Sequence, residues 1–272
     1  MVLWRGLTTA ALCAAVCFPV PAATNVAPGI AAAYLVRVDG EPVWGDAADR
    51  RLPPASLTKL MTALLIVQDY TPAAVATVSA RAAAATGSRL GLTAGERMRV
   101  GDLLAAALIG SANDACLALA EWSAGSEANF VERMNQRSVD LGLADTHFAN
   151  ACGFDAKGHY STANDLARLA DEAMRAAPIA DLVARIDLRL TDAGGRRNFH
   201  ARNRNALIGR YRGAIGVKSG YTAKAGTCVI ALAQRGEVRV LLVMLGGKNR
   251  WWDAHALLDR AFEHAAAQTH AR

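Results

Sequence analysis

A serine and a lysine stand three positions apart in the segment PPASLTKLMT, as Ser56 and Lys59. Lysine is scarce here, because only five of the thirty basic residues are lysines and the rest are arginines. An arginine keeps its proton, whereas a lysine buried beside another cation can become neutral and act as a base. Positions i and i+3 lie on one face of a helix, so the Lys59 amine can reach the Ser56 hydroxyl. The pair therefore predicts a serine nucleophile activated by a lysine.

Two further polar motifs follow along the chain. The motif SAN, residues 111–113, falls between two predicted helices, of which the first ends at Gly110. The motif KSG, residues 218–220, falls on a predicted strand near the edge of a sheet. Each of these residues taken singly would suit a helix cap or an exposed surface. The inference of one catalytic site therefore rests on the ordered set of three motifs.

Other kinds of chemistry lack their signatures. The six histidines have no HxxxH spacing and the cysteines form no CxxC, so we expect no metal site. No GxSxG elbow and no dinucleotide-binding fingerprint occurs, and no glycine precedes Lys218 as a phosphate loop would require. The sequence therefore predicts an enzyme that works without a cofactor.

The complete motif set resembles that of the penicillin-recognising serine hydrolases, which carry SxxK, S-D/G/A-N and K-T/S-G in this order. More narrowly, the chain resembles the low-molecular-weight D-alanyl-D-alanine carboxypeptidases from about residue 28 to residue 247. The resemblance includes LPPASLTKLMTA, GERMRVGDLLAAALIGSANDACLALAE, LGLADTHFAN, GHYSTANDLARLA, NRNALIGRY and GVKSGYTAKAGTC. It implies a mixed α/β fold of the DD-peptidase/β-lactamase type. In that fold an antiparallel sheet is flanked by helices, an all-α lobe is inserted, and the active site lies between them.

The resemblance assigns catalytic roles to three side chains. Ser56 would attack the carbonyl of a D-Ala-D-Ala bond and form an acyl-enzyme, and Lys59 would be the base. A lysine base has to lose about 3 pKa units to work near neutral pH, which burial and a nearby cation such as Lys218 can supply. Ser111 would pass a proton to the nitrogen of the departing D-alanine.

The same resemblance assigns the substrate-binding residues. Asn113 would hold the substrate amide and orient the lysine base. Lys218 and Ser219 would bind the terminal carboxylate of the peptide, in the motif that Gly220 completes. The backbone N–H of Tyr221, together with that of the nucleophilic serine, would form the oxyanion hole.

Two departures from the family pattern bear on these assignments. Ser219 stands where threonine is usual, which keeps the hydroxyl and loses a methyl group. The segment NACGF, residues 150–154, replaces a stretch that relatives often write Asn-Pro-Thr-Gly-Leu, and it brings Cys152 close to the expected substrate pocket. With Cys116 and Cys228 this makes three cysteines after the leader, which we interpret mostly as buried thiols. A single disulfide is an open alternative.

The bulk properties indicate an exported, folded protein. The chain has 272 residues, 53% of them hydrophobic, and a net charge of +6. Its arginines are scattered, which argues against nucleic acid as a partner and fits the anionic cell envelope. Residues 1–22 read as a signal peptide, because the apolar run is too short for a membrane anchor and ends among prolines and small residues. We therefore expect a periplasmic or secreted protein without a stable membrane anchor.

The pattern along the chain predicts one catalytic domain over residues 23–272. A strand hairpin opens it at residues 31–47, and a buried helix of about four turns follows from Ser56. Residues 75–177 read as a helical lobe, and from residue 186 the pattern changes to strands. The strands from the two ends should share one antiparallel sheet that the first and last helices cover. We expect no C-terminal β-rich domain of the kind that many relatives carry.

Three alternatives to a carboxypeptidase share the motifs. An endopeptidase would cut D-Ala-containing cross-links with the same chemistry. A serine β-lactamase of class A uses a glutamate after the second motif, and no glutamate lies between Glu132 and Glu172. A non-catalytic β-lactam sensor would not require every catalytic residue type to be intact. The preferred substrate is therefore a peptidoglycan stem peptide ending in D-Ala-D-Ala, with β-lactam antibiotics as covalent inhibitors.

Overall fold

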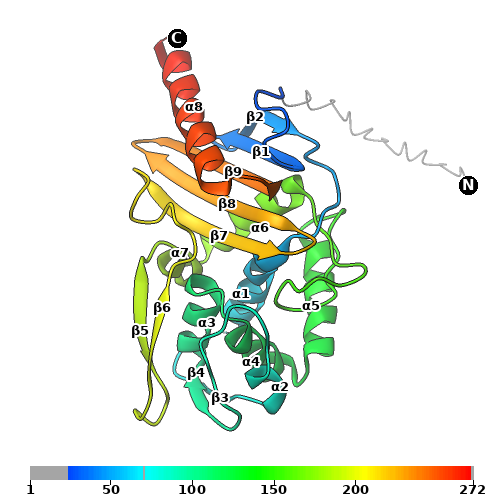
Figure 1. The fold of residues 1–272 in the computed structure, drawn as a ribbon, viewed down its shortest axis with the longest axis vertical. Helices are drawn as coiled ribbons and strands as arrows, with labels where there is room; N and C mark the ends of the chain where they lie inside the picture. The colour runs from blue at the N-terminus through cyan, green and yellow to red at the C-terminus, as the bar shows by residue number, and fades with distance from the viewer. Residues whose placement is uncertain (1–23, 70, 271–272) are drawn as a thin grey trace, which may run out of the picture.

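The computed structural model describes residues 24–69 and 71–270, so the predicted signal peptide, residues 1–22, lies outside the described residues. One part of the described molecule is a five-stranded antiparallel sheet, and most of the helices form the other part (Figure 1). The strand order is β2-β1-β9-β8-β7, which joins the two ends of the sequence in one sheet. This confirms the predicted fold class.

The opening hairpin consists of β1 (Ala33–Val38) and β2 (Glu41–Asp46). Asp39 and Gly40 form the turn with φ angles of 50° and 92°, a left-handed conformation that glycine and aspartate tolerate best. β1 also pairs antiparallel with β9 (Val238–Gly247), some two hundred residues later in the chain. The pairing of sequence-distant strands is therefore as predicted.

The C-terminal strands complete the sheet. β9 pairs with β8 (Gly226–Arg235), and β8 pairs with β7 (Ala214–Thr222), which is the edge strand. Along β8 the apolar side chains alternate between the two faces, because Val229 joins one core and Ile230 the other. The sheet thus separates two hydrophobic cores.

Helices cover both faces of this sheet, although not the pair that we expected. α8 (Arg250–His270) covers the outer face, as predicted (Figure 1). On the inner face α6 (Ala163–Arg175) and α7 (Ala177–Val183) contact the strands, whereas α1 (Lys59–Gln68) packs mainly against other helices. The reason is that α1 is apolar around most of its circumference and is buried among helices.

The helices next to the motifs begin and end at residues that the sequence marks. Gly110 follows the last residue of α3, and Gly125 ends α4 in a left-handed conformation. The Ser126 and Thr162 side chains cap α5 and α6 by accepting the backbone N–H three residues on. The bounds of these helices are η1 Ala55–Thr58, a 3₁₀ turn, then α2 Ala80–Ala83, α3 Val100–Ile109, α4 Asn113–Ala124 and α5 Glu127–Asp140.

Two short hairpins differ from the sequence-based expectation. β3 (Val75–Thr77) and β4 (Arg97–Arg99) pair within the segment expected to be helical. β5 (Asp187–Thr191) pairs with β6 (Asn198–Arg202) outside the main sheet, and β6 was not predicted. Strands of three to five residues contain too few positions for a period of two to stand out.

Candidate active site

The three motifs meet where the helical end of the molecule contacts the sheet. Ser56 lies in the 3₁₀ turn η1, Ser111 and Asn113 lie at the junction of α3 and α4, and Lys218 lies on β7. The η1 turn packs directly on β7 and β8. Three segments that are separated by more than fifty residues each therefore place their polar side chains in one region.

The Ser56 backbone is held in a tight, non-α-helical turn. The expected helix does not start at this residue, because η1 precedes α1 and α1 begins only at Lys59. A 3₁₀ helix has about three residues per turn, so side chains three positions apart lie one above the other. Ala55 has a φ of 49°, a strained conformation of the kind that clusters at functional sites. The turn thus presents Ser56 toward the lysine.

Two glycines allow neighbouring segments to approach this turn closely. A side chain at Gly220 of β7 would place its Cβ 2.8 Å from the Ser56 backbone nitrogen. A side chain at Gly153 would collide with the carbonyl of Ala55. Both positions therefore need glycine, since any larger residue would push β7 or the loop away from Ser56.

The Lys59 amine is buried and makes three polar contacts. The side chain is only 1% exposed. Its Nζ lies 3.1 Å from Ser56 Oγ, 2.7 Å from Asn113 Oδ1 and 2.6 Å from the backbone oxygen of Cys152. The latter two atoms are pure acceptors, so they take N–H bonds from the amine in either protonation state. A neutral amine bound in this way keeps its lone pair for the Ser56 hydroxyl.

Two features of the surroundings lower the pKa of Lys59 well below its ordinary value. Burial has the larger effect, because it removes the charged form from water. The positive charge of Lys218 adds to it, and the negative charge of Asp114 opposes it. The arrangement favours a neutral amine, which is what a base at this position requires.

A second lysine–serine pair faces the first. Lys218 Nζ donates a hydrogen bond of 2.9 Å to Ser111 Oγ and another of 3.0 Å to the backbone oxygen of Ser219. Both Lys218 and Ser111 are buried, and Ser111 has a φ of 58°, which is unusual for a residue with a side chain. The strained turn after α3 therefore aims the Ser111 hydroxyl at the lysine of β7.

Asn113 is oriented by bonds from both ends of its amide. Its Oδ1 accepts from Lys59, and its Nδ2 donates a 2.6 Å bond to the backbone oxygen of Thr86. Its own backbone N–H donates to the carbonyl of Ser88. Because these bonds fix which end of the amide faces the lysine, Asn113 can only accept there.

The remaining predicted substrate-binding residues lie along β7. The Ser219 hydroxyl donates a 3.0 Å bond to the backbone oxygen of Arg204, and Gly220 passes over the η1 turn. The Tyr221 side chain is 66% exposed. The structure thus brings Ser56, Lys59 and Asn113 into contact and pairs Ser111 with Lys218. Gly220 lies against the η1 turn, and Ser219 and Tyr221 are its neighbours on β7.

Asp114 was not predicted, although it directly follows the second motif. It is fully buried, and its carboxylate accepts backbone N–H bonds of 2.8–3.0 Å from residues 90–92 and from Ala115. A carboxylate in an otherwise apolar helix, ACLALA, was the signal that could have pointed to it. It anchors the segment that Asn113 also contacts.

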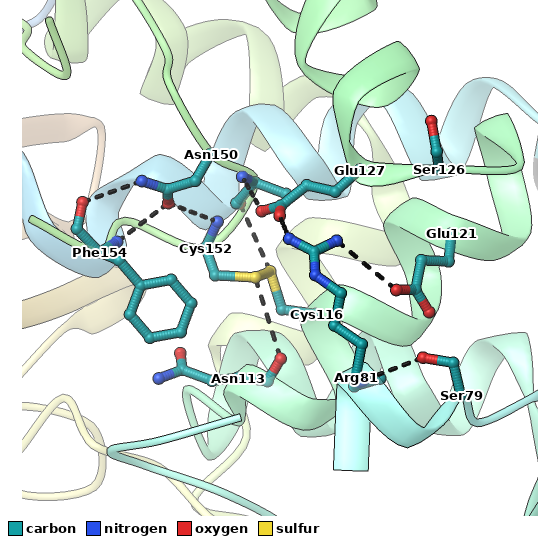
Figure 2. A network of polar contacts seen from close by, with 12 residues as sticks. Ser79, Arg81, Asn113, Cys116, Glu121, Ser126, Glu127, Asn150, Cys152 and Phe154 are labelled. Atoms are coloured by element: carbon teal, nitrogen blue, oxygen red, sulfur yellow. Dashed lines mark hydrogen bonds and ion pairs between the residues drawn. A yellow bond between two sulfur atoms is a disulfide. The ribbon is translucent and has the colours of Figure 1, made fainter. Parts of the chain in front are cut away.

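The cysteines correct the prediction of mostly buried thiols. Cys116 on α4 and Cys152 in the 150–154 segment form a disulfide, with their Cα atoms 6.0 Å apart (Figure 2). Cys228 is a buried thiol on β8. The pairing bridges residues 36 apart in sequence, and nothing in the spacing of three cysteines selects it.

The described part of the chain contains no cluster of side chains that could bind a metal ion. No group of three or more His, Cys, Asp or Glu side chains within residues 24–69 and 71–270 could hold a metal ion. The polar atoms near Ser56 are a hydroxyl, two amines, an amide and backbone groups. These groups suit proton transfer and acyl transfer.

The fold and these side chains define the class as a serine hydrolase with a lysine in the position of the base, and the comparisons specify the family. Residues 24–249 match the Peptidase S11 family, described as D-alanyl-D-alanine carboxypeptidase. The chain belongs to this family. It is 36% identical over 239 residues to the D-alanyl-D-alanine carboxypeptidase DacF of Bacillus subtilis, with 85% of this chain and 61% of the relative covered.

A bacterial relative of similar length covers almost the whole chain. The D-alanyl-D-alanine carboxypeptidase of Streptomyces sp. strain K15 is 31% identical over 279 residues, which are 94% of this chain and 96% of the relative. The crystal structure of the Streptomyces K15 DD-transpeptidase superposes with a TM-score of 0.81 at 27% identity, covering 86% of this chain and 97% of that one. By contrast, the chain spans only about three fifths of the DacF relative, at 61%.

Proposed function

We propose that the chain is a serine-type D-Ala-D-Ala carboxypeptidase that removes the terminal D-alanine from peptidoglycan stem peptides. The observation that carries this proposal is the Lys59 amine. It is 1% exposed, is held by two acceptors and lies 3.1 Å from Ser56 Oγ. A neutral lysine in this position activates a serine for acyl transfer.

In the proposed acylation step, Lys59 takes the proton of the Ser56 hydroxyl while Oγ attacks the carbonyl carbon of the penultimate D-alanine. The negative charge that develops on the carbonyl oxygen is met by the backbone N–H groups of Ser56 and Tyr221. The C–N bond then breaks, and Ser111 relays to the leaving nitrogen the proton that Lys59 took from Ser56, so that Lys59 is neutral again. Lys218 supports this transfer because it already donates to Ser111 Oγ. Water later hydrolyses the ester and frees Ser56.

Substrate binding uses the β7 side of the site. The terminal carboxylate of the peptide pairs with the ammonium group of Lys218 and the hydroxyl of Ser219, which would give up its bond to the Arg204 carbonyl. The second N–H of the Asn113 amide binds a carbonyl of the peptide backbone. A β-lactam presents a carboxylate and a strained amide in a similar arrangement, so it acylates Ser56 and is released slowly.

The acceptor of the acyl group decides between two related activities. One relative is described as a carboxypeptidase and, in its crystal structure, as a DD-transpeptidase. Water as acceptor gives the carboxypeptidase, and an amine gives the transpeptidase. The segment between Glu132 and Glu172 lacks the glutamate that class A β-lactamases use for water attack, which disfavours rapid hydrolysis of penicillin.

Export to the cell envelope completes the proposal. The apolar leader of residues 1–22 would direct secretion, and the net charge of +6 suits an anionic surface. None of the helices in the described part of the chain has the length and apolar character needed to cross a membrane.

The test combines a covalent label with product analysis. Penicillin should add to the purified wild-type protein and not to Ser56→Ala, as measured by intact mass. A pentapeptide ending in D-Ala-D-Ala should lose one D-alanine, and parallel reactions with a cross-linked dimer and with a glycine acceptor report endopeptidase and transpeptidase activity. An adduct on Ser56→Ala, or an intact pentapeptide, would contradict the proposal.

A further inference from the structure

The segment from residue 150 to residue 155, here the 150–155 loop, contacts both members of the Ser56–Lys59 pair. The backbone oxygen of Cys152 accepts the 2.6 Å bond from Lys59 Nζ. The next residue, Gly153, lies against the backbone of the η1 turn so closely that no side chain would fit. The position of this loop therefore sets where the lysine amine points.

Within the loop, one side chain organises the backbone. The Asn150 Oδ1 accepts N–H bonds of 3.2, 2.7 and 2.9 Å from Cys152, Gly153 and Phe154. Its Nδ2 donates a 2.9 Å bond to the Phe154 oxygen (Figure 2). These bonds hold the loop as a compact turn, but they do not connect it to the rest of the molecule.

The disulfide connects the loop to the helix that carries the second motif. Cys152 is bonded to Cys116 on α4, three residues after Asn113. The two acceptors that hold the Lys59 amine, Asn113 Oδ1 and the Cys152 oxygen, thus belong to one covalently closed unit. A rigid link of this kind fixes the separation of the two acceptors across the amine.

The other connections of the loop are hydrogen bonds. The carboxylate of Glu127 accepts a 2.9 Å bond from the Ala151 N–H and is paired with Arg81 on its other side (Figure 2). At the far end, Asp155 accepts a 2.6 Å bond from the Thr222 hydroxyl after β7, at an exposed site. The Asp155 contact is exposed and can break and re-form readily, whereas the Glu127 bond and a bond from the Thr62 hydroxyl to the Ala151 oxygen are buried. The disulfide is the covalent connection among them and persists until a reductant reaches it.

We propose that the Cys116–Cys152 disulfide is a positioning element for Lys59, and that acylation of Ser56 is fast only while this disulfide is oxidised. The inference rests on the proposed function, in which Lys59 is the base. Reduction by a dithiol would lower the acylation rate. The dithiol's thiolate attacks one sulfur of the disulfide and the S–S bond breaks. Both cysteines become thiols, and the dithiol closes to its own disulfide.

The expected consequence is a loss of rate rather than of binding. With the link cut, the Cys152 carbonyl can move relative to Asn113, and the lone pair of Lys59 is no longer held toward Ser56. Misplacing a catalytic group by about 1 Å can cost about 100-fold in rate, so we expect a loss of about 10- to 100-fold. The carboxylate-binding residues of β7 lie outside the closed unit, so the affinity for penicillin should change little.

The experiment measures the limiting acylation rate and the dissociation constant for a fluorescent penicillin separately. The variants are Cys116→Ser, Cys152→Ser and the double variant, with Cys228→Ser as the matched control at a buried thiol. We expect the first three to lose rate alike, with a nearly unchanged dissociation constant. Wild-type protein and Cys228→Ser should lose rate on treatment with a dithiol and regain it on reoxidation, whereas the double variant should not respond.

A pH profile separates positioning from mere stabilisation. Loosening the loop admits water to Lys59, while Lys218 of β7 and Asp114 of α4 stay in place. This raises the pKa of Lys59. As the pH is lowered, the acylation rate of the reduced protein should therefore begin to fall at a higher pH than that of the oxidised protein. Urea unfolding of each form, with thiol counts by mass, monitors the fold and the redox state.

Two outcomes distinguish the inference from the proposed function. If the reduced, folded wild-type protein acylates at the oxidised rate with the same pH profile, the disulfide only stabilises the fold and the inference is wrong. Reversible reduction of folded wild-type protein gives this answer even where a variant does not fold. If the oxidised wild-type protein forms no adduct at Ser56, the proposed function itself fails.

Discussion

Two lysine–serine pairs with buried amines face each other in this site, and they differ in what surrounds the amine. Lys59 lies 3.1 Å from Ser56 Oγ, and Lys218 lies 2.9 Å from Ser111 Oγ. Lys59 donates to Asn113 of α4 and to the disulfide-linked 150–155 loop, and burial lowers its pKa. Lys218 projects from an edge strand on the side where the substrate carboxylate would bind. The two pairs have the same functional groups at similar distances, yet we propose a neutral amine for Lys59 and a positive charge for Lys218, because the two amines have different neighbours.

The comparison teaches that the charge of one amine depends on the other. Burial alone disfavours the charged form of a lysine, and a second cation nearby makes neutralisation of one partner still more favourable. Lys218 is one of the causes that lower the pKa of Lys59. The amines also differ in their acceptors, because Lys59 donates to a side-chain amide and a loop carbonyl, whereas Lys218 donates to the Ser111 hydroxyl and to a carbonyl of its own strand.

The largest expected effect comes from Lys59→Arg. Arginine keeps the positive charge and cannot act as a base, so acylation by a fluorescent penicillin should fall by about 10²- to 10⁴-fold. The measurement is the second-order acylation rate between about pH 5 and pH 10. Near-normal acylation by this variant would place the base elsewhere.

Lys218→Arg should have a smaller effect on the same rate. The substitution preserves the positive charge that lowers the pKa of Lys59, but it changes the geometry of the contact with Ser111 and with the substrate carboxylate. We expect a loss of about 10-fold, mostly as weaker binding, which separate measurements of the limiting rate and the dissociation constant report. Equal losses for both lysine variants would mean that the two pairs are not distinguished as proposed.

The site was predictable from the sequence to the extent that it depends on ordered motifs and helix ends. Gly110 and Gly125 mark the ends of α3 and α4, and the three motifs occur in the order of a known family. The KSG motif was predicted on a strand near the edge of a sheet, and β7 is an edge strand. These features are local in sequence, or they belong to a family pattern.

What could not be predicted depends on contacts between distant segments. The 3₁₀ turn at Ser56 packs closely against Gly153 and Gly220, and those residues come about 100 and 160 positions later. The Cys116–Cys152 bond and the four N–H bonds to Asp114 are likewise properties of the folded chain. Their sequence signals were one substituted loop and one acidic residue in an apolar helix.

Asp114→Asn tests the charge environment of Lys59, the amine that we propose to be neutral. The carboxylate raises the pKa of Lys59, so its removal should lower that pKa further. The rate of acylation falls as the lysine takes up a proton, so in this variant the fall should begin at a lower pH than in the wild type. Stability should drop by about 2 kcal/mol, because an amide cannot accept the four N–H bonds as the carboxylate does. The acylation pH profile and urea unfolding at pH 7.5 measure the two effects, and an unmoved profile would contradict the assigned charge interaction.

A change at His159 should have the smallest effect on acylation and a separate effect on stability. His159 contacts Thr58, which lies between Ser56 and Lys59 in the sequence. The ring Nδ1 accepts a 2.9 Å bond from the Ala149 N–H, so Nε2–H donates the 2.8 Å bond to Thr58 Oγ1. This neutral form is buried, and burial is the main reason that the pKa of His159 is lowered from 6.5 to about 4, with His147 adding to it.

The linkage of this histidine to stability has a defined sign. In the unfolded chain His159 takes up a proton below about pH 6.5, while in the folded protein it does so only near pH 4. The unfolded state therefore binds more protons in this window, and stability falls as the pH is lowered through it. The shift corresponds to a loss of about 2 to 3 kcal/mol between pH 7.5 and pH 4.5. Urea unfolding of wild type and His159→Gln should show this additional loss in the wild type alone, because glutamine keeps a donor and an acceptor without titrating. Parallel pH dependences would show that the ring is hydrated or protonated in the folded protein, and that Thr58, between Ser56 and Lys59, is not held by a neutral imidazole.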